Sequence, residues 1–180
     1  GLSGARRVLP IIDDVPEIQD KVNAKELNFT KGQIIFENVD FKYLTKETQV
    51  LNSINLNIPG EKMTALVGQS GAGKSSIINL ISRFYDPSSG QIFINEEDIK
   101  DVNISSLRNN IALVSQDTII YNKSFLDNIK FGNLEAKDKK VKEAAKLAGI
   151  HGFIKNSLYG YETIVGESGI NLSGGQKQRI

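Results

Sequence analysis

The chain has 180 residues, enough for one domain with a substantial core, and its 39% apolar and 24% charged residues are ordinary for a globular protein. Its formal net charge of +1 gives no electrostatic case for nucleic acid as a partner, and the lack of cysteine excludes disulfides, zinc–thiolate sites and thiol catalysis. No stretch approaches the roughly 18 apolar residues of a membrane span, and the N-terminus is unlike a signal peptide, so this sequence is expected to be soluble.

The first third of the chain reads as a short helix, a linker and two strands. Residues 1–12 predict a short helix that Pro10 ends, and the polar, aperiodic residues 13–31 predict an extended linker. Residues 32–43 have strand spacing with a break near Asn38. Residues 50–58 alternate strictly between apolar and polar, and the Pro59-Gly60 turn follows.

The middle of the chain predicts an α/β core. The continuous apolar runs 62–68 and 111–115 are typical of buried strands in a parallel sheet. Residues 75–85 and 104–110 predict helices, and 91–95 predict another strand. From 123 to 158 the pattern is helical, and the basic run 137–142 is expected to be the solvated face of a helix.

Between the run 62–68 and the following helix lies a glycine-rich loop, GQSGAGKS (68–75), which matches the pattern G-x-x-x-x-G-K-[ST]. Glycines allow successive backbone N–H groups to turn toward a phosphate, and the helix start adds the positive end of its dipole. Lys74 can reach the β- and γ-phosphates, and the Ser75 hydroxyl can ligate Mg²⁺. An accidental glycine-rich turn is the alternative, which the flanking strand and helix patterns disfavour. The predicted ATP-binding residues here are Gly68, Ser70, Gly71, Ala72, Gly73, Lys74, Ser75 and Ser76.

A second motif, LSGGQKQRI (172–180), places Ser-Gly-Gly before a helix-forming segment. Ser173 can cap that helix, and Gly174 and Gly175 permit close backbone approach, so the segment could hold a second anion. A simple helix cap with a flexible turn is the alternative.

The two motifs, about a hundred residues apart, together resemble the phosphate loop and signature of ATP-binding cassette (ABC) proteins over about residues 32–180. The resemblance implies an α/β P-loop NTPase fold with an antiparallel β subdomain, a RecA-like parallel-sheet core and a helical subdomain at about 117–172. It implies ATP and Mg²⁺ as cofactors. It also implies that a second copy's ATP is bound in trans by the signature residues Ser173, Gly174, Gly175 and Gln176.

Three further residues acquire roles from the resemblance. Tyr43 matches the aromatic residue that stacks on adenine; its alternative is a tyrosine packed on the sheet. Gln116 matches the glutamine that reaches Mg²⁺ and the attacking water, which makes it catalytic together with Lys74; its alternative is a generic polar residue after a strand. Glu167 matches an acidic residue that contacts the coupling helices of exporters, and an exposed loop glutamate is its alternative.

The segments FENVDFKY, SFLDNIKFG and VGESGINLSGGQKQRI are similar to bacterial lipid-flippase and multidrug exporters. Residues 1–31 would then be the end of a last transmembrane helix and a linker, with the permease in the same longer chain. The intact protein is expected to dimerise, as a homodimer, at the cytoplasmic face of the cell membrane and to export a lipid or hydrophobic substrate. The family's Asp-Glu strand and switch histidine follow the signature and are expected beyond Ile180, so the C-terminal part of the core would be missing and this fragment nearly inactive.

Three rival interpretations remain from the sequence. A DNA-repair type ATPase shares both motifs, but such proteins carry coiled coils and the gap here has no heptads. A non-catalytic ATP-binding fragment and an importer subunit would be distinguished by the coding sequence on either side.

Overall fold

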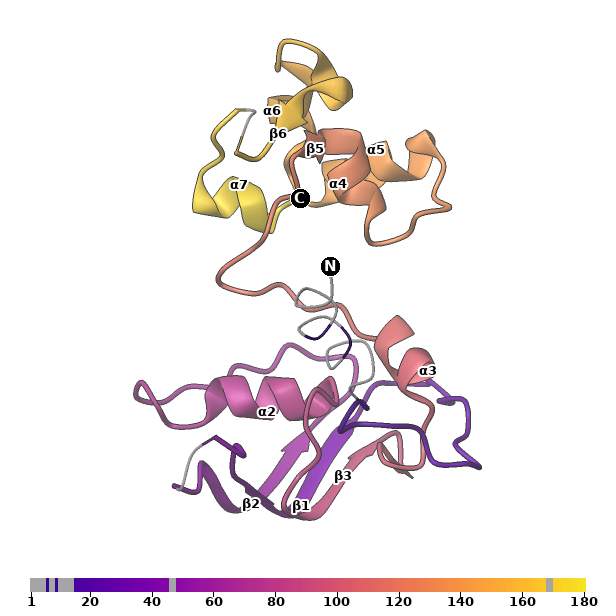
Figure 1. The fold of residues 1–180 in the computed structure, drawn as a ribbon, viewed down its shortest axis with the longest axis vertical. Helices are drawn as coiled ribbons and strands as arrows, with labels where there is room; N and C mark the ends of the chain where they lie inside the picture. Colours follow the sequence, from indigo (N-terminus) through magenta and orange to yellow (C-terminus); the bar gives the residue numbers. More distant parts are fainter. Residues whose placement is uncertain (1–5, 7–8, 10–14, 46–47, 168–169) are drawn as a thin grey trace. The chain divides into compact units, whose positions relative to one another are not determined.

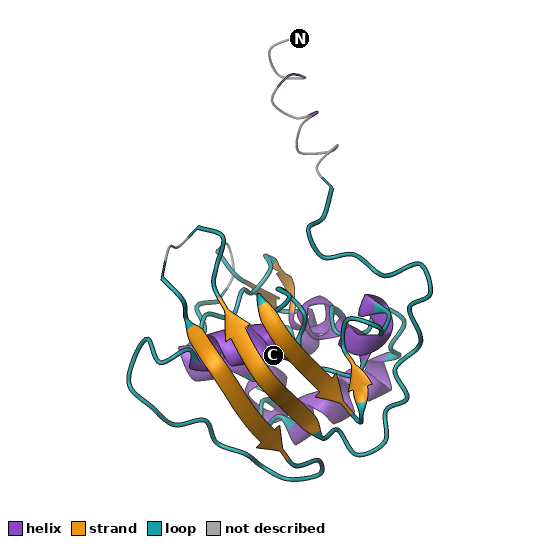
Figure 2. Cartoon of the chain, turned by 90° about the horizontal axis from the view of Figure 1, so that it is seen from below, coloured by secondary structure: helices purple, strands orange, loops and turns teal. Residues whose placement is uncertain are grey.

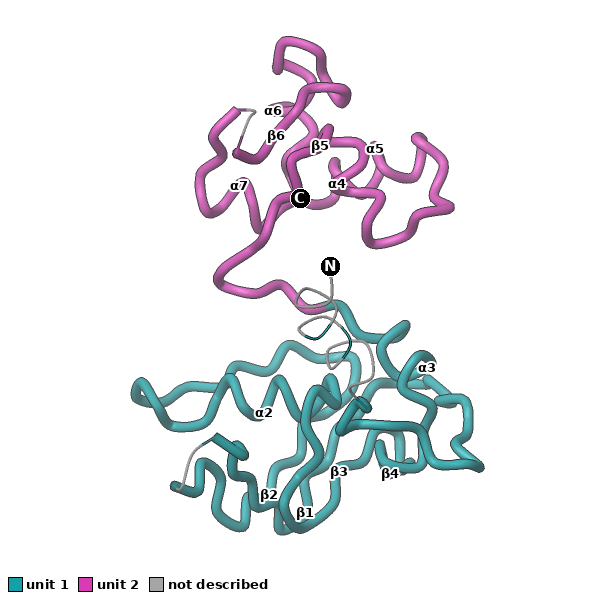
Figure 3. The backbone as a smooth tube through the Cα atoms, viewed as in Figure 1, with its two compact units in different colours: residues 1–112 teal, residues 113–180 magenta. Residues whose placement is uncertain are grey.

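The computed structural model describes residues 6, 9, 15–45, 48–167 and 170–180, and most of the expected helix over 1–12 therefore lies outside the described residues. The chain divides into two compact units, residues 1–112 and 113–180, coloured separately in Figure 3. Each unit has its own apolar core and is described by itself. Within the described part of the chain, no helix combines the length and the apolarity needed to cross a bilayer.

The first unit is built on an antiparallel sheet (Figures 1 and 2). Its strands are β1 (Ile34–Phe41), β2 (Leu51–Ile58), β3 (Ser89–Ile94) and β4 (Glu97–Asp98), in the order β2-β1-β3-β4. The predicted break in the first strand is confirmed, because Asn38 has a φ of 48° and the register with β2 shifts between Phe36 and Val39. The predicted alternation in 50–58 is also confirmed, since Asn55 and Asn57 are exposed while their neighbours are partly buried.

Helix α2 (Lys74–Ile81) follows the glycine-rich loop and covers one face of this sheet (Figure 1). Its residues Ile77 and Leu80 are buried in the core with the strands. The helix predicted for 75–85 ends earlier than expected because Arg83 adopts a left-handed φ of 48°. Helix α3 (Ile104–Asn109) agrees with the prediction and is capped by Asn103, whose side chain accepts from the Ser106 N–H.

The two runs predicted as buried parallel strands are not strands. Residues 62–68 and 111–115 have no regular structure, and Met63 and Val67 are 101% and 89% exposed. Apolar composition alone does not make a strand, since its backbone N–H and C=O groups need a neighbouring strand. None of the described strands pairs with either run. The prediction that these two apolar runs form strands of a parallel sheet is therefore wrong.

Residues 15–31, predicted as an extended linker, have no helix and a single parallel bridge, Lys25 to Val102. The segment is nevertheless seated on the first unit, because Leu27 is buried in its core. Its assignment as a linker after a transmembrane helix stays a prediction.

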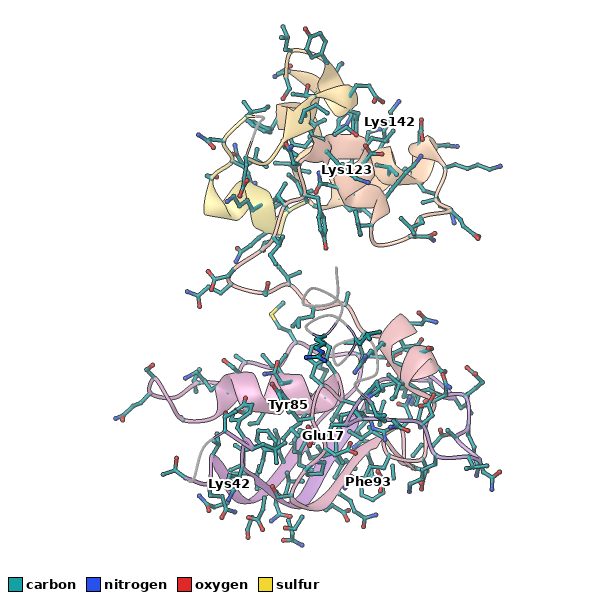
Figure 4. All side chains as sticks on the ribbon, viewed as in Figure 1. Glu17, Lys42, Tyr85, Phe93, Lys123 and Lys142 are labelled. Carbon is teal, nitrogen blue, oxygen red and sulfur yellow. The ribbon has the colours of Figure 1, made fainter. Side chains whose placement is uncertain are left out.

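The second unit is mainly helical, as predicted for 123–158. Its elements are β5 (Lys123–Ser124), α4 (Phe125–Lys130), α5 (Asp138–Leu147), α6 (His151–Lys155), the 3-10 helix η1 (Gly160–Glu162), β6 (Ile164–Val165) and α7 (Gly174–Gln178). Its core is formed by Phe125, Ala145, Ile150, Ile154 and Val165. On α5 the lysines are exposed while Val141 and Ala145 are buried, so the basic run is a solvated helix face as predicted; Lys142 is labelled in Figure 4.

Candidate nucleotide-binding site

The glycine-rich loop is shaped by Gly73, at the point where it enters α2. Gly73 has a φ of 85°, and a Cβ added to it would lie 2.5 Å from Leu51 Cδ2 and 3.3 Å from the Val50 carbonyl oxygen. Both its backbone conformation and its closeness to β2 therefore require glycine. The α2 helix starts directly afterwards, with the Ile77 N–H donating to the Gly73 carbonyl.

Lys74 bridges the loop from the first turn of α2. Its Nζ donates to the Gly68 carbonyl at 2.8 Å and to the Gln69 carbonyl at 2.7 Å. The ammonium is thus held at the mouth of the loop it is predicted to serve. An anion in the loop would offer oxygens that compete with these two carbonyls, and charge-assisted bonds to phosphate are stronger than bonds to a neutral carbonyl.

The loop's donor set suits a phosphate group. Ser70, Gly71, Ala72 and Ser75 are exposed, and a Cβ added at Gly71 would meet nothing within 4 Å. The loop offers exposed backbone N–H groups, the Lys74 ammonium and the exposed hydroxyls of Ser70 and Ser75 as donors, and residues 68–76 contain no acidic side chain.

Tyr43 is tied directly to the start of α2. Its hydroxyl shares a hydrogen bond of 2.9 Å with Ser76 Oγ, and Ser76 is buried. The ring packs edge-on against Phe41 and Tyr85, with centroid distances of 4.7 and 5.1 Å. Tyr85, labelled in Figure 4, follows α2 in the chain. The structure therefore joins two predicted site residues, Tyr43 and Ser76, and also shows the sheet packing that was the alternative for Tyr43.

The second motif forms a reciprocal cap at the start of α7. Ser173 Oγ accepts from the Gln176 N–H at 3.3 Å, and Gln176 Oε1 accepts from the Ser173 N–H at 2.9 Å. The cap predicted for Ser173 is confirmed. Gly174 and Gly175 are exposed, and an added Cβ would meet nothing at either position. Because the cap uses Ser173 as an acceptor, its hydroxyl hydrogen can still be donated to a ligand.

Gln116 is exposed in a loop that the second motif contacts. The preceding residue, Ser115, donates from Oγ to the Asp117 carbonyl. The Ser115 carbonyl accepts from Thr118 Oγ1 and, at 3.3 Å, from Gln178 Nε2. The end of α7 is thus bonded to the residue next to Gln116.

Glu167 lies beside the same loop. A hollow of about 280 Å³ brings together residues from the loop after Gln116, from the loop around Glu167 and from α7. Thr118, Ile119, Ile170 and Lys177 are among its lining residues, together with Glu167 itself. The hollow is lined by one acidic and one basic side chain, Glu167 and Lys177, together with polar and apolar neighbours.

The predicted residues fall into two groups. Tyr43 and the residues of 68–76 lie in the first unit, whereas Gln116, Glu167 and residues 173–176 lie in the second. Gln178, Ser115 and the Tyr43–Ser76 pair were not predicted from the sequence. Nothing in local spacing signals them, since their partners are up to 63 residues away in the chain.

Comparison with known proteins agrees with this geometry. The chain is 46% identical over its full length to an ATP-dependent lipid A-core flippase of Syntrophus aciditrophicus (strain SB), and 47% identical over 96% of its length to a putative multidrug export ATP-binding/permease protein of Staphylococcus aureus (strain NCTC 8325 / PS 47). It spans 30% of the length of each of these relatives. A bacterial Atm1-family ABC exporter solved with ATP bound has a TM-score of 0.91 and 39% identity, covering 99% of this chain and 31% of that one.

The fold is thus that of an ABC-type P-loop ATPase, as predicted, although the runs 62–68 and 111–115 are not strands. The ABC transporter family model matches residues 51–180. With a matching family model and relatives of this similarity, the chain belongs to the ABC transporter family.

Proposed function

We propose that this chain is the nucleotide-binding part of an ABC exporter and that it binds ATP with Mg²⁺ through residues 68–76. The observation that carries the proposal is the loop geometry. Gly73 is locked against β2, and Lys74 is held by two carbonyls of the loop that it closes. This arrangement keeps the ammonium at the loop, where the oxygens of a triphosphate could take over its bonds.

In this proposal each loop residue has a defined task. Lys74 exchanges its bonds with the Gly68 and Gln69 carbonyls for bonds to phosphate oxygens. The N–H groups at the start of α2 orient the phosphates, and Ser75 offers its hydroxyl oxygen to the metal. Bound Mg²⁺ would neutralise charge that develops on the phosphates during transfer. Among the described residues, no group of three or more Asp, Glu, His or Cys could hold a metal.

The adenine would stack on Tyr43, whose position is set by Ser76 and the neighbouring aromatic rings. The signature residues Ser173, Gly174, Gly175 and Gln176 would bind the ATP of a second copy. The capped Ser173 keeps a hydroxyl hydrogen for a phosphate oxygen, and the two open glycines let it approach. Because one chain carries both halves of the site, two copies could pair, and we propose a homodimer.

In the intact protein, a permease in the same longer chain would be driven by this domain at the cytoplasmic face of the cell membrane. ATP would favour the closed dimer because it is contacted by both copies there. The hollow around Glu167 would receive part of the permease. Gln116, which shortly precedes the lining residue Thr118 in the chain, would link that contact to the reaction. Both relatives are named as export or flippase proteins, which supports a lipid or other hydrophobic substrate.

Hydrolysis would need a water-activating acid that residues 173–180 do not supply. We therefore expect the 180-residue chain to bind nucleotide with little turnover.

A titration with a fluorescent ATP analogue and Mg²⁺ tests the proposal. The unaltered chain should bind saturably. Lys74→Ala should abolish binding, and Tyr43→Ala should weaken it by about tenfold, in line with the stacking energy of one base on an aromatic ring. Lys62→Ala, an exposed lysine outside the loop, is the matched control and should bind normally. Equal binding by the Lys74 and Lys62 variants would contradict the proposal.

A further inference from the structure

A buried arginine at the end of α2 holds the chain segment that precedes the sheet. Arg83 is 2% exposed, and its guanidinium makes contacts in three directions. It donates to Asp86 Oδ1 at 3.1 Å, to the Val102 carbonyl at 3.2 Å and to the Gln19 carbonyl at 3.2 Å. A buried guanidinium that is hydrogen-bonded to one carboxylate depends on these carbonyls to satisfy its other donors. The Gln19 carbonyl therefore helps to hold Arg83, and with it the C-terminal end of α2, in place.

A second arginine ties the same end of α2 to α3. Arg108 donates from Nε to the Ser82 carbonyl at 3.2 Å and from Nη2 to the Arg83 carbonyl at 2.8 Å. Its guanidinium also lies 5.0 Å from the centre of the Phe84 ring. Because helix-end carbonyls lack intrahelical partners, these bonds fix the C-terminal end of α2 to α3.

The start of α3 is in turn held from the segment before the sheet. Asp20 accepts from the Ile104 N–H at 2.7 Å and from Asn103 Nδ2 at 2.7 Å. Asp20 thus accepts from the first backbone N–H of α3, which lacks a partner within the helix, and it also holds the capping residue Asn103.

Residues 19–27, which we call the brace, are seated by backbone bonds as well. The Lys25 N–H donates to the Asp101 carbonyl at 2.9 Å, and the Lys25 carbonyl accepts from the Asn103 N–H at 2.7 Å. The Leu27 N–H donates to Ser106 Oγ at 2.8 Å, and its side chain is buried. Glu17, just before the brace, is labelled in Figure 4.

We infer that the brace is linked energetically to nucleotide binding through α2, with Arg83 and Asp20 as positioning residues. The inference rests on the proposed function. Helix α2 has eight residues, so about 12 Å separates the phosphate loop at its start from the brace contacts at its end. A helix this short moves as a rigid body, and a shift at either end reaches the other. The brace and the nucleotide therefore favour the same placement of α2, and each strengthens the binding of the other.

Asp20→Ala tests the inference because Asp20 contacts neither the loop nor α2. Removing its charge should, by Coulomb's law alone, favour an anionic ligand, so weaker binding would have to come from positioning. In the whole 180-residue chain, we expect Asp20→Ala to weaken binding of the fluorescent ATP analogue by about fivefold, the lower end of typical coupling between sites. Glu26→Ala removes the same charge from an exposed position in the brace and should bind like the unaltered chain. Arg83→Lys keeps the positive charge but loses the planar guanidinium that bonds Asp86, Val102 and Gln19 together. It should weaken nucleotide binding as Asp20→Ala does.

Hydrogen exchange supplies the reciprocal readout. The nucleotide should slow exchange of the Leu27 and Ile104 amides in the unaltered chain and leave it unchanged in Lys74→Ala. Unchanged affinity in a folded Asp20→Ala chain would overturn the inference and leave the proposed function intact. Absence of binding by the unaltered chain would overturn both.

Discussion

Replacement of Gly73 by alanine probes the contact that shapes the phosphate loop. Alanine in the left-handed conformation costs about 1–2 kcal/mol. The new Cβ would also lie 2.5 Å from Leu51 Cδ2, and Leu51 is 2% exposed, so the core has to shift to admit it. Overpacking of this kind costs about 1–3 kcal/mol. Gly73→Ala should therefore lower the free energy of unfolding by about 2–5 kcal/mol in total.

Gly71→Ala is the matched control, since Gly71 has a φ of 84° and an added Cβ would meet nothing within 4 Å. Gly71→Ala should lower the free energy of unfolding only by the cost of placing alanine in the left-handed conformation, about 1–2 kcal/mol. Urea unfolding followed by circular dichroism measures both variants. In a Leu51→Val background, which removes the clashing methyl group, the cost of Gly73→Ala should fall toward that of Gly71→Ala. Equal costs for the two glycines in the unaltered background would refute the reasoning.

Three further predictions concern single side chains. Tyr43→Phe removes the hydrogen bond to Ser76 and should destabilise the chain by about 0.5–1.5 kcal/mol in urea unfolding while leaving nucleotide affinity nearly unchanged, because the ring is retained. Asn128→Ala, which removes an 8% exposed amide that bonds the loop before α4, should cost about 2–4 kcal/mol by the same method. Hydrogen bonds, chiefly from Ser89, hold the pKa of Asp40 below its usual range. The stability that the carboxylate contributes is therefore present above about pH 4 and is lost as the pH falls through the folded-state pKa. Asp40→Asn should be destabilising at pH 7, and its cost in urea unfolding should shrink as the pH falls below about 4.

Local patterns predicted the elements whose stability is mostly local. The alternation in 50–58, the break near Asn38 and the Ser173 cap of α7 were all visible as short-range signals. The runs 62–68 and 111–115 were predicted as strands and are not, because strand formation depends on a partner that the run itself does not specify.

The phosphate loop was likewise predicted from a local pattern, whereas the brace depends on contacts between distant parts of the chain. The loop could be predicted because its glycines, lysine and serine lie within nine consecutive residues and their chemistry is fixed by spacing. The brace could not be predicted, since Asp20 finds its partner 84 residues away and polar composition alone indicated a linker. The early end of α2 depends on Arg83, whose buried contacts favour a left-handed conformation that its residue type does not suggest.

The central claim is that residues 68–76 recognise the phosphate chain of ATP. Calorimetric titration of the 180-residue chain with Mg²⁺ and either ATP or AMP tests it most directly, because AMP keeps the adenine and lacks the β- and γ-phosphates. ATP should bind saturably, AMP should bind at least about tenfold more weakly, and Lys74→Ala should lose this difference. Equal affinity for ATP and AMP, or an undiminished preference for ATP in Lys74→Ala, would contradict it.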